Sequence, residues 1–230
     1  MARTRAVDFE EKQRGLLDKA AEVFAELGME KASMAQIAAH SQVSKALLYH
    51  YYPSKDALIF AIIITHLEEL DAAIEETDDP GLPPQQRLRQ LVGTVLERYR
   101  GADNQHKVQL NATPALGDEQ KAEILGVERR IVKRFAAVLR EINPDLDDPQ
   151  RPLLTPVTMS LFGMMNWVYM WFRDGGRITR EDYADVATTL ILEGIKPCGE
   201  AAPARRRLTR AAGLRDKAVV HLLVCMPKAR

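Results

Sequence analysis

Apolar residues recur at helical spacing along almost the whole of this chain, and this regularity most restricts what it can fold into. The chain contains no convincing alternation of apolar and polar residues bounded by turn residues, so no β-strand is predicted. In the first predicted helix, Leu16, Val23 and Leu27 fall on one face. Gly28 follows directly and suits a left-handed helix end. The sequence therefore predicts an all-α fold, and it contains no internal repeat.

Glycine and proline residues divide this pattern into separate helices. After Gly28 we expect two short helices, at Met34–His40 and Ser44–Tyr49, joined by only three residues. A long helix then begins after Pro53 with Ser54 as its N-cap and reaches about Glu76. Further helices are expected at about 85–100, 103–112, 118–142, 153–173 and 179–195, the last capped by Thr179.

Three regions with different roles follow from this division. Residues 1–55 are predicted to form one helical domain and residues 56–197 a second one, and a proline-rich break at 78–84 marks the joint between two halves of the chain. Residues 198–230 form a basic tail, in which positions 201–230 hold eight Lys+Arg and one Asp. Its simplest interpretation is a solvated, disordered tail, and the alternative is an arm that contacts DNA nonspecifically. The 32 Lys+Arg and 32 Asp+Glu of the whole chain thus cancel between an acidic body and a basic tail.

Several classes of protein are excluded by what the sequence lacks. The longest apolar run, Ala57–Ile64, is far shorter than the roughly 20 residues that span a bilayer. The first twelve residues are charged and contain no apolar signal segment, so we expect a cytoplasmic protein. The five histidines and two cysteines show no metal-ligand spacing, and no nucleophile motif or glycine-rich phosphate loop occurs. We therefore expect neither an enzyme nor a bound metal or cofactor.

The segment 33–55, SMAQIAAHSQVSKALLYHYYPSK, carries the most specific chemistry. Two short helices joined by so tight a turn predict a helix-turn-helix, whose second helix can enter the DNA major groove. A packing corner is the alternative for two short helices alone. Polar and aromatic side chains of this segment suit phosphates, base edges and thymine methyl groups. The residues expected to contact DNA are Ser33, Met34, Gln42, Ser44, Lys45, Leu47, Tyr49, His50, Tyr51 and Lys55. Tyr52 is instead expected to lie in the core.

The order of these elements resembles the start of TetR/AcrR-family regulators. The run from Val43 to Leu58, VSKALLYHYYPSKDAL, is closely similar to that family's signature, and the resemblance covers about residues 10–60. It implies a three-helix DNA-binding domain followed by a helical domain for effector binding and dimerisation. It further implies a transcriptional repressor that binds a near-palindromic, double-stranded operator as a homodimer. In the family, the residue at the position of Lys55 contacts a backbone phosphate.

The last two predicted helices are the best candidates for a dimer interface. Phe162, Gly163 and Val168 belong to an apolar surface in which a small residue permits close approach of a partner helix. Val186 and Leu190 continue such a surface at helical spacing. The family resemblance points the same way, because these repressors commonly dimerise through their last two long helices.

The second domain also contains candidates for an effector pocket. Residues 155–195 resemble the C-terminal domain of a TetR subgroup that senses acyl-CoA thioesters, which would make such a thioester the effector. Core packing is the simpler explanation for the aromatic residues, and a solvated surface is the simpler one for the basic residues. The predicted effector residues are Asn166, Trp167, Trp171, His106, Gln109, Arg130 and Arg134. The alternative function is an effector-independent, nucleoid-associated DNA-binding factor of the same fold.

Overall fold

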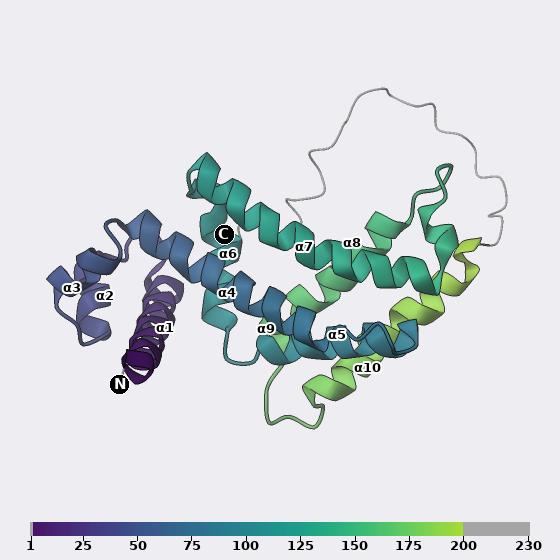
Figure 1. Ribbon diagram of the computed structural model, residues 1–230, viewed down its shortest axis with the longest axis horizontal. Helices are drawn as coiled ribbons and strands as arrows, with labels where there is room; N and C mark the ends of the chain where they lie inside the picture. Colours follow the sequence, from purple (N-terminus) through teal and green to yellow (C-terminus); the bar gives the residue numbers. More distant parts are fainter. Residues whose placement is uncertain (1, 200–230) are drawn as a thin grey trace. The chain divides into compact units, whose positions relative to one another are not determined.

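The computed structural model describes residues 2–199, with side chains from residue 12 onward, and every element in this range is helical (Figure 1). The helices are α1 (Ala2–Leu27), α2 (Met34–His40), α3 (Lys45–Tyr51), α4 (Lys55–Thr77), α5 (Pro84–Arg98), α6 (Asp103–Ala112), α7 (Asp118–Ile142), α8 (Leu154–Asn166), α9 (Val168–Trp171) and α10 (Arg180–Ile195). Short 3-10 turns lie at Thr113–Ala115, Pro144–Asp147 and Lys196–Gly199. The all-α prediction is confirmed. Within the described residues, none of these helices has the length and apolarity to cross a membrane.

Polar side chains begin the helices where the sequence predicted them. The Oγ atom of Ser44 accepts a hydrogen bond from Leu47 N at 3.1 Å, and that of Ser54 accepts one from Ala57 N at 3.0 Å. Each bond satisfies a backbone N–H group that has no partner within its helix. Gly28 has a φ of 82°, the left-handed conformation expected where α1 ends.

One predicted helix is divided in two. The sequence suggested a single helix over about 153–173, but the helix stops at Asn166, and α9 starts only after Trp167. Trp167 has φ −83° and ψ −8°, which departs from regular helix geometry. The residues 166–169, Asn-Trp-Val-Tyr, all have modest helix propensity, so little local energy is lost at this break.

Two compact units make up the described chain. The first comprises residues up to Glu69 together with Gly101–Gly126, and the second comprises Leu70–Arg100 and the residues from Val127 on. In the first unit, α6 packs along α1, and α2 packs against both α1 and α3 (Figure 1). Its core consists of apolar side chains with almost no exposed surface, including Phe24, Ile37, Leu48, Leu58 and Ile62.

The second unit is a helical layer built mainly around α5, α8 and α10. α10 packs closely along α5 and also contacts α8. The rings of Phe135 and Phe162 meet edge to face, with their centroids 5.0 Å apart and no more than 2% of either side chain exposed. The predicted boundaries at residues 55 and 197 remain predictions, because the compact units are defined by packing and place α6 with the N-terminal helices. The predicted tail lies outside the described residues from position 200 on.

Candidate nucleic-acid interface

The first helix of the pair, α2, begins with a reciprocal cap. Ser33 Oγ accepts a hydrogen bond from Gln36 N at 3.3 Å, and Gln36 Oε1 accepts one from Ser33 N at 2.9 Å. This capping box fixes the start of α2 and occupies the Ser33 hydroxyl, which also donates to Gln36 Oε1 at 2.8 Å. Ser33 therefore stabilises the start of α2 through both its side chain and its backbone N–H group.

The turn between the two helices depends on an unusual backbone conformation. Gln42 has a φ of 57°, and it is the non-glycine residue with positive φ in the described chain. Backbone hydrogen bonds hold the turn closed, from Ser41 N to Ile37 O at 2.9 Å and from Val43 N to Ala38 O at 3.0 Å. Since a side chain in this region costs about 1–2 kcal/mol, the surrounding packing must impose the conformation. The Gln42 side chain is exposed.

The second helix, α3, is anchored on one side and exposed on the other. Leu48 is completely buried and holds the helix to the core of the unit. Tyr49 is 42% exposed and Leu47 is 41% exposed, and the side chains of Lys45 and His50 are exposed as well. The Lys45 ammonium lies 5.7 Å from the centre of the Tyr49 ring, a cation–π arrangement that places a charge and a phenol side by side. The structure thus brings together four of the predicted DNA contacts.

The two tyrosines that end this segment have different environments. Tyr52 is 6% exposed, as predicted, and its hydroxyl accepts a hydrogen bond from Gln13 Nε2 at 3.2 Å. Burial raises the pKa of Tyr52 above its ordinary value of 10.0, so the phenol stays neutral. Tyr51 is half-buried, and its ring lies edge to face against His50 with centroids 5.5 Å apart. Only Tyr51 retains surface that a ligand or a nucleic acid could contact.

Two of the predicted DNA contacts have a different role in the structure. Lys55 directs its Nζ atom to the carbonyl oxygens of Met29, Glu30 and Ala32, at 2.7, 3.4 and 3.4 Å. These bonds join the start of α4 to the loop after α1. In this structure the Lys55 ammonium therefore stabilises the fold, and its hydrogen bonds go to backbone carbonyls. Met34 is 6% exposed and packs in the core. The sequence pattern did not reveal either role, because the partners of Lys55 lie more than 20 residues away.

The predicted effector residues are distributed between the two compact units. In the first unit, His106 and Gln109 of α6 are 3% and 2% exposed, so both are buried polar groups. His66 of α4, which the sequence analysis did not single out, belongs to the same unit, and burial lowers its pKa to about 4. At neutral pH this ring is therefore uncharged.

In the second unit, Asn166 accepts a hydrogen bond from the Tyr99 hydroxyl at 2.8 Å. Tyr99 is buried, and burial raises its pKa strongly, with the nearby Glu128 carboxylate as a second cause. Trp167 and Trp171 are 38% and 48% exposed. These residues combine aromatic surface with a few oriented polar groups, which is the usual composition of a small-molecule site.

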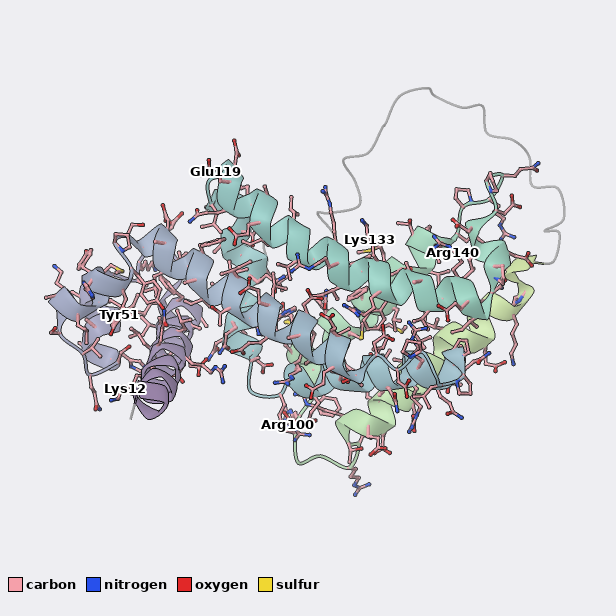
Figure 2. The ribbon with its side chains drawn as sticks, in the orientation of Figure 1. Lys12, Tyr51, Arg100, Glu119, Lys133 and Arg140 are labelled. Atoms are coloured by element: carbon pink, nitrogen blue, oxygen red, sulfur yellow. The ribbon has the colours of Figure 1, made fainter. Side chains whose placement is uncertain are left out.

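The basic residues of α7 separate into paired and unpaired groups. Arg130 forms an ion pair with Asp71 at 2.9 Å, and Arg134 approaches Asp78 at 3.5 Å. Both guanidinium groups, which the sequence predicts to be effector residues, thus join α7 to the end of α4. Arg129 and Lys133 are exposed and form no ion pair with a described side chain. Figure 2 labels Lys133 on α7. Both cations remain available for a ligand phosphate.

Two family models match the chain. Residues 16–62 match the family "Bacterial regulatory proteins, tetR family", and residues 81–195 match "Tetracyclin repressor-like, C-terminal domain". The chain is also similar to the HTH-type transcriptional repressor KstR2 of Rhodococcus jostii. The two are 25% identical over 188 residues, which cover 78% of this chain and 89% of that repressor.

Solved structures give the same result. A TetR-family transcriptional regulator from Bordetella parapertussis is 29% identical, with a TM-score of 0.71 over 77% of this chain and 92% of that one. AibR, solved in complex with isovaleryl coenzyme A and operator DNA, is 27% identical, with a TM-score of 0.66 over 78% of this chain and 97% of that one. Similarity therefore extends over both the helix-turn-helix and the domain that follows it.

Proposed function

Because the chain belongs to the TetR family of transcriptional regulators, a family of DNA-binding proteins and not of enzymes, we propose that it represses transcription from a palindromic operator. In this proposal it binds as a homodimer in the cytoplasm, and a small-molecule effector, an acyl-CoA or aryl-CoA thioester, releases it. The observation that carries the proposal is the exposed face of α3, where Lys45, Tyr49 and His50 project from a helix that Leu48 fixes to the core.

The chemistry of this face suits operator DNA. Lys45 and His50 can donate hydrogen bonds to phosphates or base edges, and the Tyr49 ring can contact a thymine methyl group. The first 60 residues contain eight basic and eight acidic side chains, so net charge does not drive binding. Placement of the basic and aromatic groups on one exposed face supplies the affinity instead.

A palindromic operator requires two such faces. Half-sites are read one helical turn apart, about 34 Å, so a second copy of the chain must present the second α3. Val186 and Leu190 of α10 are 50% and 60% exposed, a large apolar surface for one helix. Gly163 of α8 is exposed, and a Cβ atom at its position would meet nothing within 4 Å. These features support a dimer through α8 and α10.

Three observations support an acyl-CoA effector. The similar protein AibR was solved with isovaleryl coenzyme A. Trp167 and the hydrogen-bonded pair of Tyr99 and Asn166 offer an aromatic surface and a polar anchor for an acyl group. Arg129 and Lys133 offer exposed positive charge for the phosphates of the coenzyme. An effector needs to favour the non-binding state by only a few kcal/mol to empty the operator.

The test is a fluorescence-anisotropy titration of the full-length protein on labelled DNA from upstream of its own coding sequence. A panel of acyl-CoA and aryl-CoA thioesters is then added, with free coenzyme A and the free acids as controls. At least one thioester is expected to weaken operator binding by about tenfold or more, whereas free coenzyme A has no effect. Operator binding that no thioester changes would instead favour the effector-independent DNA-binding factor, and absence of operator binding would refute both.

A further inference from the structure

A groove of about 420 Å³ lies in the first unit, between α1 and the recognition helix α3. Its residues come from three segments: Lys12, Gln13, Gly15, Leu16 and Lys19 from α1, Ser41 and Val43 from the turn, and Leu47 and Tyr51 from α3. The volume falls within the range of about 300–1,000 Å³ that small-molecule sites occupy. Figure 2 shows two of its residues, Lys12 and Tyr51, in this unit.

Gly15 helps to keep this groove open. It lies in the interior of α1, where glycine costs roughly 1 kcal/mol relative to alanine, and its φ is not positive. No neighbour excludes a side chain there, because a Cβ atom built at Gly15 would meet nothing within 4 Å. Neither backbone conformation nor packing within the chain explains the glycine. The space that its missing side chain leaves is part of the groove.

Ser41 adds a second feature that points to a ligand. Its side chain lines the groove and is 8% exposed, and its Oγ atom has no hydrogen-bond partner among the described residues. A buried hydroxyl without a partner costs about 1–3 kcal/mol. Rotation about the Cα–Cβ bond allows this hydroxyl to donate to an oxygen atom seated at the base of the groove.

The lining of the groove indicates the chemistry of that ligand. Leu16, Val43 and Leu47 make its walls apolar, and the Tyr51 ring extends them. Lys19 of α1 brings an ammonium group to the groove, and no acidic side chain lines it among the described residues. An ammonium group beside an apolar surface favours a molecule with one anionic end and one apolar end.

We propose that this groove binds a small amphipathic anion, whose carboxylate meets Lys19 and Ser41 while its hydrocarbon body lies along Leu47 and Tyr51. The site is separate from the second domain, in which the CoA effector is proposed to bind. Because Leu47 and Tyr51 belong to the recognition helix, occupancy changes the surface available to DNA. That last consequence rests on the proposed DNA-binding function, but ligand binding itself does not.

The test uses decanoate and the full-length protein without DNA. Isothermal titration calorimetry measures the affinity, and a diazirine derivative of decanoic acid, cross-linked by light and mapped by mass spectrometry, locates the site. Cross-links are expected in the segments 12–19 and 41–51. 1-Decanol, which lacks the charge, is expected to bind about three- to tenfold more weakly, as is decanoate to Lys19→Gln.

Two substitutions at Gly15 form a matched pair. Gly15→Met fills the groove and is expected to weaken decanoate binding at least tenfold, whereas Gly15→Ala removes the same glycine and is expected to change it by less than threefold. Both favour the helix, so thermal melts should show neither variant to be less stable. Binding that Gly15→Met leaves intact, cross-links confined to residues 81–195, or no binding at millimolar decanoate would each overturn the proposal. If Gly15→Met instead weakened only operator binding, the groove would be part of the DNA interface and the proposal would again be wrong.

Discussion

The caps of the helix-turn-helix and the buried polar groups of the second compact unit find their partners at different distances along the sequence. In the helix pair, the capping residues Ser33 and Ser44 bond to neighbours three residues away. In the second unit, the buried Arg180 bonds to the carbonyl of Leu96, 84 residues distant, and the buried Tyr99 bonds to Asn166, 67 residues distant. The helix starts of the DNA-binding segment are therefore determined by neighbouring residues. Buried polar groups of the second unit depend instead on partners that are distant in the sequence.

The largest effect is expected from a substitution in the aromatic core of the second unit. Phe135→Ala is expected to lower the free energy of unfolding by about 3–5 kcal/mol, because it leaves a cavity beside Phe162. Thermal denaturation followed by circular dichroism measures the loss, with the 57% exposed Met170→Ala as the control. A change of less than about 1 kcal/mol would mean that the layer collapses around the cavity and is not rigidly packed.

The exposed face of α3 should behave in the opposite manner. Lys45→Ala and Tyr49→Ala are each expected to weaken operator binding by at least about 30-fold, since one contact per half-site costs about 1–3 kcal/mol and a dimer loses two. The melting temperature and the dimer mass should stay unchanged. A mobility-shift assay measures binding, with the exposed Lys31→Ala as the control. Undiminished binding by both variants would remove α3 from the DNA interface.

An ion-pair cluster in the second unit predicts a dependence of stability on pH. Burial would raise the pKa of Asp78, but hydrogen bonds and charges from Arg87 and Arg134 outweigh it and hold the pKa below its ordinary value of 3.8. A carboxylate with a lowered pKa in the folded state stabilises the protein above its unfolded pKa. This contribution is lost as pH falls through the lower, folded value.

Asp78→Asn is therefore expected to be less stable than the wild type by about 1–3 kcal/mol at pH 7, because charge-assisted hydrogen bonds are lost. The difference should shrink as pH falls below about 4. Urea denaturation at several pH values measures it. The exposed Asp79→Asn is the matched control and should resemble the wild type. A difference that does not depend on pH would show that the Asp78 charge is not what matters.

The smallest expected effect lies in the turn of the helix pair. Gln42→Gly is expected to stabilise the protein by about 0.5–1 kcal/mol, because relief of the positive φ exceeds the added freedom of glycine in the unfolded chain. A melting-temperature increase of a few degrees is the measurement, and operator binding in the same variant shows whether the Gln42 side chain contacts DNA. A lower melting temperature would indicate that the side chain itself stabilises the turn.

Features encoded within a few residues of each other could be predicted from the sequence. The start of each short helix, the N-caps at Ser44 and Ser54, the end of α1 at Gly28 and the burial of Tyr52 all follow from local patterns, and the structure confirms them. These signals work because a cap or a turn is satisfied by its own neighbours.

Features that depend on distant partners could not be predicted. In the sequence, Arg130 is a basic residue on a predicted helix surface. In the structure it pairs with Asp71, which lies 59 residues earlier in the chain. The family resemblance predicts that Lys55 contacts a phosphate. In the structure its ammonium group donates to three backbone carbonyls from the loop after α1. The groove beside Gly15 had no sequence signal, because its walls come from two helices and a turn that only folding brings together.

The environment of Lys55 also affects its chemical reactivity. Three carbonyl oxygens accept hydrogen bonds from its Nζ atom, so a reagent reaches this amine only after those bonds break. Acylating reagents should therefore modify Lys31 and Lys45 quickly and Lys55 slowly. Modification of Lys55 would proceed mainly through molecules in which the loop after α1 has opened. The rate of labelling at this one lysine thus reports how often the DNA-reading end of the molecule loosens while the rest stays folded.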